Sequence, residues 1–382
     1  MAAAIASPEA FAARLLVPTV LVGALLILAA HGIWRVIAIA DAWNSARRGP
    51  GVRNSALPLL IALSLIVVFG HTAAGYYLAA TTTAASPIFV GGNDDLDNVI
   101  DPLPGGPLPT EGPINVLFVG IDSASSRDHA LTDTIMLASF DRELGSVVQI
   151  SFPRDTGRLP MYDGTTFNPR INSLLGRANR DAERYPDGGI GTLSREIGYL
   201  LGVDVHYYAA VDMDGFRQLV DAVGGVDIEV TKQIADPVRR LYLEPGRHHF
   251  DGETALNYVR SRFGPGNSDY ERARRQQQVL RALGQRVRDP FVVARIPDIV
   301  ATAARLVRTN MPLEDLDQLL AVLDAANRAD ARHIVLRPNR YAQRVPPEEV
   351  GGRFMTELKM DAVAELSIEL FGSRSRYAAS TP

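Results

Sequence analysis

Two long apolar stretches without formal charge stand near the start of the chain. Residues 15–34 (LLVPTVLVGALLILAAHGIW) and 57–80 (LPLLIALSLIVVFGHTAAGYYLAA) contain no Asp, Glu, Lys or Arg. Because about 20 apolar residues in a helix span about 30 Å of hydrocarbon, each stretch is long enough to cross a bilayer. A cleaved signal peptide followed by a core helix is the alternative, but the first stretch has no clear small-residue cleavage site. The pattern therefore predicts two transmembrane helices.

The charges that flank these stretches predict their orientation. The loop between them carries one acid and four arginines, namely Asp41, Arg35, Arg47, Arg48 and Arg53. The N-terminal tail balances Arg14 with Glu9. Loops rich in Lys and Arg face the cytoplasm. Residues 1–56 are therefore predicted to form an outer tail, the first helix and a basic cytoplasmic loop. We expect a two-pass protein of the cell membrane whose remaining chain is extracytoplasmic.

The rest of the chain reads as a linker followed by an α/β domain. Residues 81–113 are rich in Pro, Gly, Thr and Asp, which is typical of an extended linker. Beyond it, short β-branched runs alternate with stretches of helical spacing. Strands are predicted at 114–121, 134–140, 147–152, 207–211, 226–230 and 333–336, and helices at 192–201, 214–223, 251–260, 269–287 and 290–328. This alternation predicts a layered α/β domain over 114–340. A C-terminal extension, 341–382, is predicted to contain a helix and a flexible tail.

Composition excludes several function classes. The chain has 39 Lys and Arg against 43 Asp and Glu, a net charge of −4, which does not indicate a nucleic-acid binder. It has no cysteine, which excludes disulfides, cysteine nucleophiles and thiolate metal sites. The GxxxxGK[ST], HExxH and GxSxG signatures are missing from the sequence. The pair His248-His249 is interpreted as part of a solvated turn.

Acids and one arginine stand at the ends of three predicted strands. Asp122 follows the first strand, Asp133 precedes the second and Arg154 follows the third. Ligands of open α/β sheets bind beyond the carboxyl ends of the strands. Each residue alone could be a turn or capping residue, but together they predict a site.

A second cluster begins where two predicted helices meet. Arg260 and Arg262 end one helix, and Asp269, Arg272, Arg275 and Gln276 begin the next. Helical spacing puts Arg272 and Gln276 on one face with Leu280 and Leu283, which we expect to be buried. The opposite face, Arg274, Gln278, Arg281 and Gln285, is expected to be solvated. Guanidinium groups suit phosphate oxygens, and two carboxylates suit Mg²⁺. The combination, outside a membrane, predicts a diphosphate substrate.

These residues lie in motifs that resemble the LytR-CpsA-Psr (LCP) family of cell-wall glycopolymer ligases. The resemblance covers about residues 114–287, with a tail typical of the family to about Pro338. The motifs are VGID (119–122), TDTIML (132–137), FPRDT (152–156), RIN (170–172), DMDGF (212–216), LVDAVGGVDIEV (219–230), FDGETALNYVRSR (250–262) and DYERARRQQQVL (269–280). Their number and order make the resemblance specific.

The resemblance implies an α-β-α layered domain with a mixed central sheet and an apolar tunnel for a polyprenyl diphosphate lipid. Carried over by position, Asp122 and Asp133 would hold Mg²⁺, with Mn²⁺ as a substitute, and Asp269 would be the base. The diphosphate would be held by Arg154, Arg170, Arg260, Arg262, Arg272 and Gln276, with Arg275 added by its place in the cluster. Leu131 departs from the family, which has Arg there, and Arg127 in the same loop is the candidate substitute.

The expected function is an LCP-type phosphotransferase. A sugar hydroxyl of peptidoglycan would attack a polyprenyl diphosphate-linked glycan, with Arg260, Arg262 and Asp269 as catalytic residues, and polyprenyl phosphate would leave. A diphosphatase that uses water, or a non-catalytic polyprenyl-phosphate-binding regulator of the cell envelope, is the alternative. The expected partners are the lipid-linked donor, peptidoglycan and the lipid bilayer, and not nucleic acid.

Overall fold

The computed structural model describes most of the chain outside its N-terminal tail and several connecting segments. The described residues are 18–47, 57–90, 109, 111–122, 131–141, 146–261, 263, 269–286, 289, 292, 299, 302, 306–311 and 332–380.

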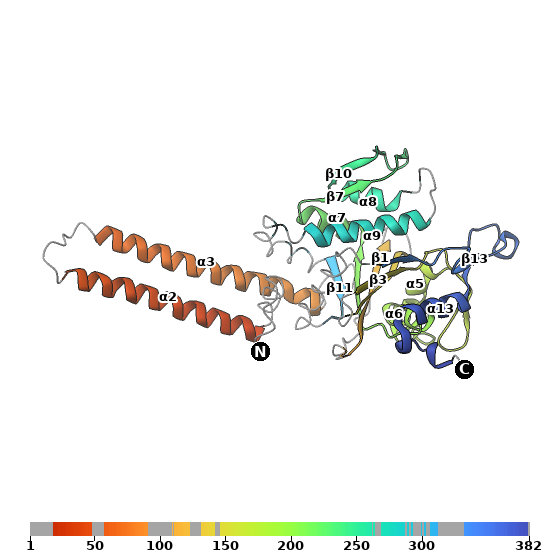
Figure 1. Ribbon diagram of the computed structural model, residues 1–382, viewed down its shortest axis with the longest axis horizontal. Helices are drawn as coiled ribbons and strands as arrows, with labels where there is room; N and C mark the ends of the chain where they lie inside the picture. The colour runs from red at the N-terminus through yellow and green to blue at the C-terminus, as the bar shows by residue number, and fades with distance from the viewer. Residues whose placement is uncertain are drawn as a thin grey trace.

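Two long helices form an N-terminal hairpin that extends away from the α/β domain (Figure 1). They are α2 (Pro18–Arg47) and α3 (Leu57–Val90), and their segments Val20–Trp43 and Ile61–Ala80 are long and apolar enough to cross a membrane. The helices touch where Nδ1 of His31 lies 3.0 Å from Nε2 of His71. Helix α3 continues ten residues beyond the predicted span, into the segment expected to be a linker.

A six-stranded mixed sheet forms the centre of the domain, as the sequence predicts. Its order is β11-β6-β1-β2-β3-β12. The strands are β1 (Pro113–Asp122), β2 (Leu131–Asp141), β3 (Ser146–Ser151), β6 (Tyr207–Asp212), β11 (Val307–Thr309) and β12 (Arg332–Val335). Strand β1 runs parallel to β6 and antiparallel to β2, and β3 runs parallel to β12.

Strand β11 corrects the predicted helix over 290–328. Val307 and Thr309 are β-branched, and β11 pairs antiparallel with β6, so that the sheet gains an edge strand here. Sheet pairing thus outweighs the helical pattern of the neighbouring sequence. Much of 290–328 lies outside the described residues.

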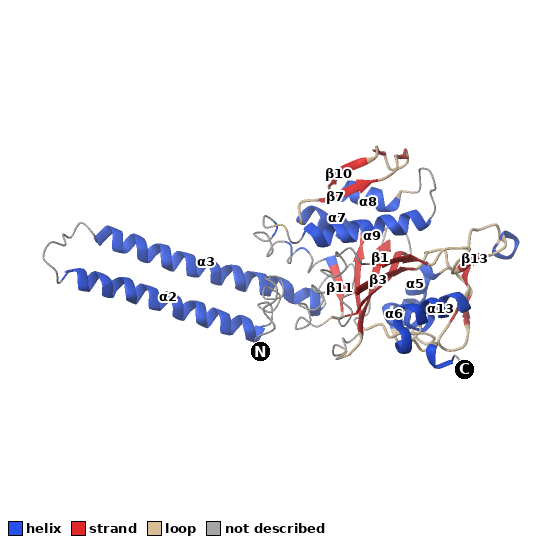
Figure 2. Ribbon diagram, viewed as in Figure 1, coloured by secondary structure: helices blue, strands red, loops and turns tan. Residues whose placement is uncertain are grey.

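One face of the sheet is covered by α5 (Leu174–Arg180), α6 (Gly188–Leu201) and α13 (Met360–Phe371) (Figure 2). Leu117, Leu137 and Ile150 from the sheet belong to one buried core with Leu193 of α6 and Leu366 of α13. Shorter elements surround this core, namely β4 (Leu159–Pro160), β5 (Thr166–Phe167), η2 (Ile171–Ser173), β13 (Ala342–Arg344), η4 (Pro347–Val350) and β14 (Thr356–Leu358).

The end of the chain packs against this layer instead of forming the predicted flexible tail. The structure continues through η5 (Gly372–Arg374) and η6 (Ala378–Ser380). Ser375 is buried, its hydroxyl lies 2.7 Å from that of Ser367, and the Tyr377 hydroxyl donates to the Leu200 carbonyl at 3.1 Å. These hydrogen bonds satisfy buried polar groups, so the segment is held to the helices beneath it.

The opposite face carries α7 (Met213–Ala222), α8 (Gly252–Arg260) and α9 (Asp269–Arg286) (Figure 1). Two hairpins cap these helices, β7–β10 (Val226–Val230 and Gly246–Phe250) and β8–β9 (Ile234–Asp236 and Leu241–Leu243). Val220, Ile228, Phe250, Tyr258 and Val279 share a core separate from that of the other layer. Asp251 is the N-cap of α8, because its Oδ1 accepts a hydrogen bond from the Thr254 N–H at 2.8 Å.

Helix α8 approaches α7 so closely that only glycine fits at its first position. A Cβ on Gly252 would lie 2.1 Å from the backbone oxygen of Arg217. We expect Gly252→Ala to lower the free energy of unfolding by about 1–3 kcal/mol, because α8 must move away from α7. Glu253→Ala, at the exposed next position, is the control and should change it by less than about 0.5 kcal/mol. Thermal melts that do not distinguish the two variants would contradict this packing.

Candidate functional site

A β-bulge lies between the two predicted metal-binding acids, at one end of the sheet. Gly120 pairs with Thr134, but the next residue, Ile121, pairs with Thr132, so Asp133 is the extra residue of β2. A bulge re-aims the side chain of the extra residue. Asp122 ends the neighbouring strand β1 and is 6% exposed. The structure therefore brings the ends of β1 and β2 together as the sequence predicts.

Arg154 and Arg170 join this site through one shared acid. Nη1 of Arg154 donates to Oδ1 of Asp133 at 2.5 Å. Asp155 lies between the two arginines, with Oδ2 3.8 Å from Arg154 Nε and Oδ1 3.1 Å from Arg170 Nη1. Arg170 also donates to the Phe354 carbonyl at 2.7 Å. Asp155, a residue of the FPRDT motif for which the sequence predicts no role, therefore orients both guanidinium groups.

Arg260 reaches the site from the opposite layer. It is the last residue of α8, and its Nη2 lies 3.8 Å from Oδ2 of Asp122. Its side chain is 28% exposed, whereas that of Asp122 is 9% exposed. A half-buried guanidinium retains donors for further acceptors. Arg260 can therefore pair with Asp122 and bind an anion at the same time.

Arg239 is a site residue that the sequence analysis missed. It lies in the β8–β9 turn, where Asp236, only 1% exposed, accepts a hydrogen bond from its N–H at 3.0 Å and has Oδ2 3.8 Å from its Nε. Burial, and then the charge of Arg260, lower the pKa of Arg239, while Asp133 and Asp122 act in the opposite direction. Arg239 therefore lies within electrostatic range of Arg260 and of both acids. The DPVRR sequence gave no signal, because turns commonly carry exposed arginines.

An apolar pocket of about 270 Å³ opens onto these charges. Its walls come from β1, β2, β6 and β11 of the sheet and from α7, α8 and α9 above it. Most of the lining is apolar, including Phe118, Met136, Phe216, Leu256, Leu280 and Leu283. The polar and charged residues of the lining are Asp133, Thr134, Asp212, Arg260 and Gln276. The cavity therefore joins an apolar interior to a charged end.

Helix α9 lines this pocket with the predicted face, but the leucines of that face are less buried than predicted. Gln276, Leu280 and Leu283 share a face as expected, but the two leucines are half-buried because they line the cavity instead of the packed core. Arg272 is buried, with 4% exposed. Gln277, also buried, donates to the Ser151 hydroxyl at 3.0 Å and fixes α9 to the end of β3.

Arg275, for which the sequence predicts a diphosphate contact, lies at the junction of α8 and α9. Its Nη2 donates to the Ser261 carbonyl at 2.9 Å, and its guanidinium carbon lies 5.6 Å from the centre of the Tyr258 ring. Burial lowers the pKa of Arg275 and raises the pKa of Tyr258 to about 12. These contacts fix the Arg275 side chain between the two helices.

The face of α9 that was expected to be solvated is only partly so. Arg274 is exposed, but Arg281 contacts His333, and Gln278 donates to the Glu229 carbonyl at 2.7 Å. Partial desolvation by neighbouring atoms, and then the charge of Arg281, lower the pKa of His333 to about 4.

Three predicted site residues lie partly or wholly outside the described part of the chain. Arg262 and Arg127 are not among the described residues, and Asp269 begins α9 without a described side chain.

The donor set at the strand ends fits a magnesium ion. Among the described residues, no group of three or more His, Asp or Glu side chains gathers as a metal site. Mg²⁺ binds through one or two carboxylates and completes its shell with water and substrate phosphates. Asp122 and Asp133 supply those carboxylates, and the neighbouring arginines suit the phosphates. The residues present therefore fit Mg²⁺ bound together with a phosphate substrate.

Comparison with known proteins decides the family. The model of the LytR_cpsA_psr family matches residues 93–343. The chain belongs to the LytR-CpsA-Psr family. The expectations of an LCP relationship and of an α-β-α domain with a mixed sheet are confirmed.

Two curated relatives of this LCP protein are each 30% identical to it. One is the polyisoprenyl-teichoic acid–peptidoglycan teichoic acid transferase TagV of Bacillus subtilis, matched over 67% of this chain and 64% of TagV. The other is the regulatory protein MsrR of Staphylococcus aureus, matched over 54% of this chain and 59% of MsrR. The chain thus spans less than two thirds of the length of these curated relatives.

Solved structures share the fold. The crystal structure of B. subtilis TagV has a TM-score of 0.55 at 23% identity, covering 72% of this chain and all of that one. A structure of TagT bound to LI-WTA has a TM-score of 0.51 at 22% identity, covering 69% of this chain and 92% of TagT.

Proposed function

We propose that this LCP protein is an extracytoplasmic phosphotransferase that moves a glycopolymer from a polyprenyl diphosphate carrier onto peptidoglycan. The observation that carries the proposal is the apolar pocket that ends at Asp133, Arg260 and Gln276. A ligand that fits both parts has a long apolar tail and a compact anionic head. The names of TagV and of TagU from Bacillus cereus, both polyisoprenyl-teichoic acid–peptidoglycan teichoic acid transferases, support this substrate class.

The lipid tail would lie between the sheet and the helices. Phe216 of α7, Leu256 of α8 and Leu280 of α9 face the same cavity. Burying apolar surface there contributes about 25 cal/mol per Å² removed from water. The tail would therefore supply much of the affinity without taking part in the chemistry.

The diphosphate would lie among the arginines at the end of the pocket. Arg154 and Arg260 approach from opposite sides, one from the sheet and the other from α8, each beside an acid. Guanidinium groups present paired donors that match phosphate oxygens. Arg239 adds a third cation on the side of the β8–β9 turn. Because negative charge develops on phosphoryl oxygens during transfer, donors already fixed at these positions stabilise the transition state.

The transfer would form one bond and break one. The acceptor sugar hydroxyl attacks the glycan-proximal phosphorus, and the bond from that phosphorus to the bridging oxygen breaks. The bridging oxygen leaves with polyprenyl phosphate. Asp269, at the start of α9, would accept the hydroxyl proton. Asp122 and Asp133 would hold Mg²⁺, or Mn²⁺ in its place, which would neutralise charge on the phosphoryl oxygens.

The helical hairpin would anchor the domain at the outer surface of the membrane. The arginine-rich loop between α2 and α3 should lie in the cytoplasm. We expect a reporter that is active only outside the membrane to be active when fused after Pro382. Activity found only with a reporter that functions in the cytoplasm would contradict this topology.

A single assay separates the three functional hypotheses. The full chain in detergent micelles is given a polyprenyl diphosphate-linked glycan and Mg²⁺, with and without purified peptidoglycan. Glycan that becomes covalently attached to peptidoglycan, together with released polyprenyl phosphate, is the expected result. Release of the glycan at equal rates without peptidoglycan would indicate a diphosphatase. Binding without turnover would indicate a regulator, the role that the name of MsrR describes for that relative.

A further inference from the structure

A second pocket, of about 350 Å³, is rich in arginine. Its lining contains Arg177, Arg180 and Arg184, one acid, Asp181, and two aromatic residues, Phe167 and Tyr185. None of these residues belongs to the proposed diphosphate site or to the proposed metal site.

The local fold gathers the three arginines on one side. Arg177 and Arg180 are three residues apart in the last turn of α5, so they share a helix face. The chain then turns, because Asp181 Oδ1 accepts a hydrogen bond from the Arg184 N–H at 3.1 Å and the Tyr185 N–H donates to the Asp181 carbonyl at 2.9 Å. This turn returns Arg184 to the same pocket.

The pocket combines exposed arginines with two buried aromatic side chains. All three guanidinium-bearing residues are exposed, whereas Phe167 and Tyr185 are 4% and 6% exposed. The guanidinium carbon of Arg184 lies 5.4 Å from the centre of the Tyr185 ring. A planar guanidinium held over an aromatic ring loses less side-chain freedom when it binds an anion.

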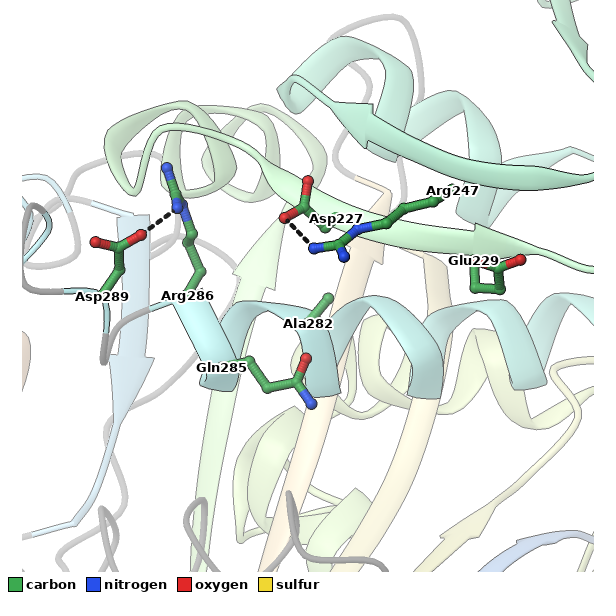
Figure 3. A pocket seen from close by; sticks show the side chains of 7 residues that line it. All are labelled: Asp227, Glu229, Arg247, Ala282, Gln285, Arg286 and Asp289. Atoms are coloured by element: carbon green, nitrogen blue, oxygen red, sulfur yellow. Dashed lines mark hydrogen bonds and ion pairs between the residues drawn. The ribbon is translucent and has the colours of Figure 1, made fainter.

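The charges of this pocket differ from those of the larger polar pocket between β7, β10 and α9 (Figure 3). There each arginine has an acid, with Arg247 3.1 Å from Asp227 and Arg286 2.5 Å from Asp289. Within the described part of the chain, no carboxylate forms an ion pair with Arg177 or Arg184, although Asp163 lies within electrostatic range of Arg184. The arginine-rich pocket therefore carries an excess of positive charge that suits an anion.

The position of the pocket indicates which anion it meets. Pro169 lines the pocket, and the next residue, Arg170, pairs with Asp155 of the catalytic site at 3.1 Å. Helix α5 lies at the end of the domain away from the α2–α3 hairpin (Figure 1). The pocket is therefore linked to the catalytic site through consecutive residues, at the end of the domain away from the hairpin.

We propose that the arginine-rich pocket binds carboxylate or phosphate groups of the saccharide chain that meets the diphosphate at the catalytic site. Peptidoglycan carries carboxylates on its peptides, and cell-wall glycopolymers commonly carry phosphates, so acceptor and donor share this chemistry. The identity of the saccharide rests on the proposed function, whereas anion binding by the pocket does not.

The test compares two triple variants of equal charge in the full chain in detergent micelles. The pocket variant is Arg177→Ala/Arg180→Ala/Arg184→Ala, and the control is Arg247→Ala/Arg340→Ala/Arg353→Ala, at exposed positions elsewhere. The probes are purified peptidoglycan, the same peptidoglycan with its carboxylates amidated, and a soluble phosphate-containing glycopolymer without lipid. Co-sedimentation or titration measures binding, and the transfer assay gives KM for each substrate.

We expect the pocket variant to bind one anionic probe at least tenfold more weakly than the control, with kcat at saturation nearly unchanged. If the pocket variant binds native peptidoglycan more weakly, and the wild-type protein binds amidated peptidoglycan equally weakly, the pocket binds the acceptor. Weaker binding of the glycopolymer assigns it to the donor. Equal binding by both variants to all probes overturns the proposal. Because binding is read without turnover, failure of the phosphotransferase proposal would be seen separately.

Discussion

Replacing Asp122 or Asp133 by Asn should reduce Mg²⁺-dependent turnover on the order of 10²–10³-fold, comparable to losing one preorganised group that stabilises transition-state charge. Each substitution removes one of the two carboxylates that would hold the ion and keeps the size of the side chain. The rate of polyprenyl phosphate release over a range of Mg²⁺ concentrations measures the effect. Turnover close to wild type in either variant would remove that acid from the metal site.

Thermal melts without metal should show a small decrease in the stability of these variants. Asp133 pairs with Arg154 at 2.5 Å and Asp122 lies 3.8 Å from Arg260, so each acid offsets a neighbouring positive charge. Losing that partner leaves arginine charges less compensated. Asp214→Asn is the matched control, because Asp214 has a side chain that is 77% exposed on α7, and it should leave both turnover and melting temperature unchanged.

Arg260→Lys should lower kcat/KM about tenfold to a hundredfold, because lysine keeps the charge but loses the two-pronged donor geometry. The loss of one charge-assisted hydrogen bond to a diphosphate oxygen costs about 1.5–3 kcal/mol, which gives this range. If Arg260 merely ended α8, lysine would serve equally well, because a cation near a helix C-terminus contributes about 0.3–1 kcal/mol whichever residue carries it. Initial rates at low donor concentration measure the ratio.

Arg274→Lys is the control for this comparison. The Arg274 side chain is 71% exposed and pairs with Glu271 at 3.5 Å on the outer side of α9. Arg281, which the sequence places on the same outer face, is unsuitable because it contacts His333. Arg274→Lys should change kcat/KM less than about twofold, since exposed pairs contribute little. Equal loss at Arg260 and Arg274 would mean that the site lies elsewhere.

The sequence predicted the central sheet well because its strands are short apolar runs bounded by polar residues. It also predicted that Asp122, Asp133, Arg154 and Arg260 meet, since strand ends and motif order place them. Strand β11 was missed because three residues that pair at a sheet edge carry little signal of their own. The packed C-terminal segment was missed because its serines look like a mobile tail until Ser375 meets Ser367.

Individual roles of arginines could not be read from the sequence. Arg275 lies on the same helix as the other predicted diphosphate ligands. Its guanidinium nevertheless donates to the Ser261 carbonyl at the α8–α9 junction. Arg239 is in an ordinary turn sequence, and only tertiary structure places it near Arg260. Guanidinium contacts depend on which backbone segment approaches the side chain, and long-range packing decides this.

The most direct test of the account is a crystal structure of the protein with a short polyprenyl diphosphate and Mg²⁺. The account predicts isoprenoid density between the sheet and α7–α9, against Phe216 and Leu280. It also predicts the diphosphate within hydrogen-bond distance of Arg154 and Arg260, with the metal on Asp122 and Asp133. A chain bound outside this pocket, or a diphosphate remote from both acids, would contradict it.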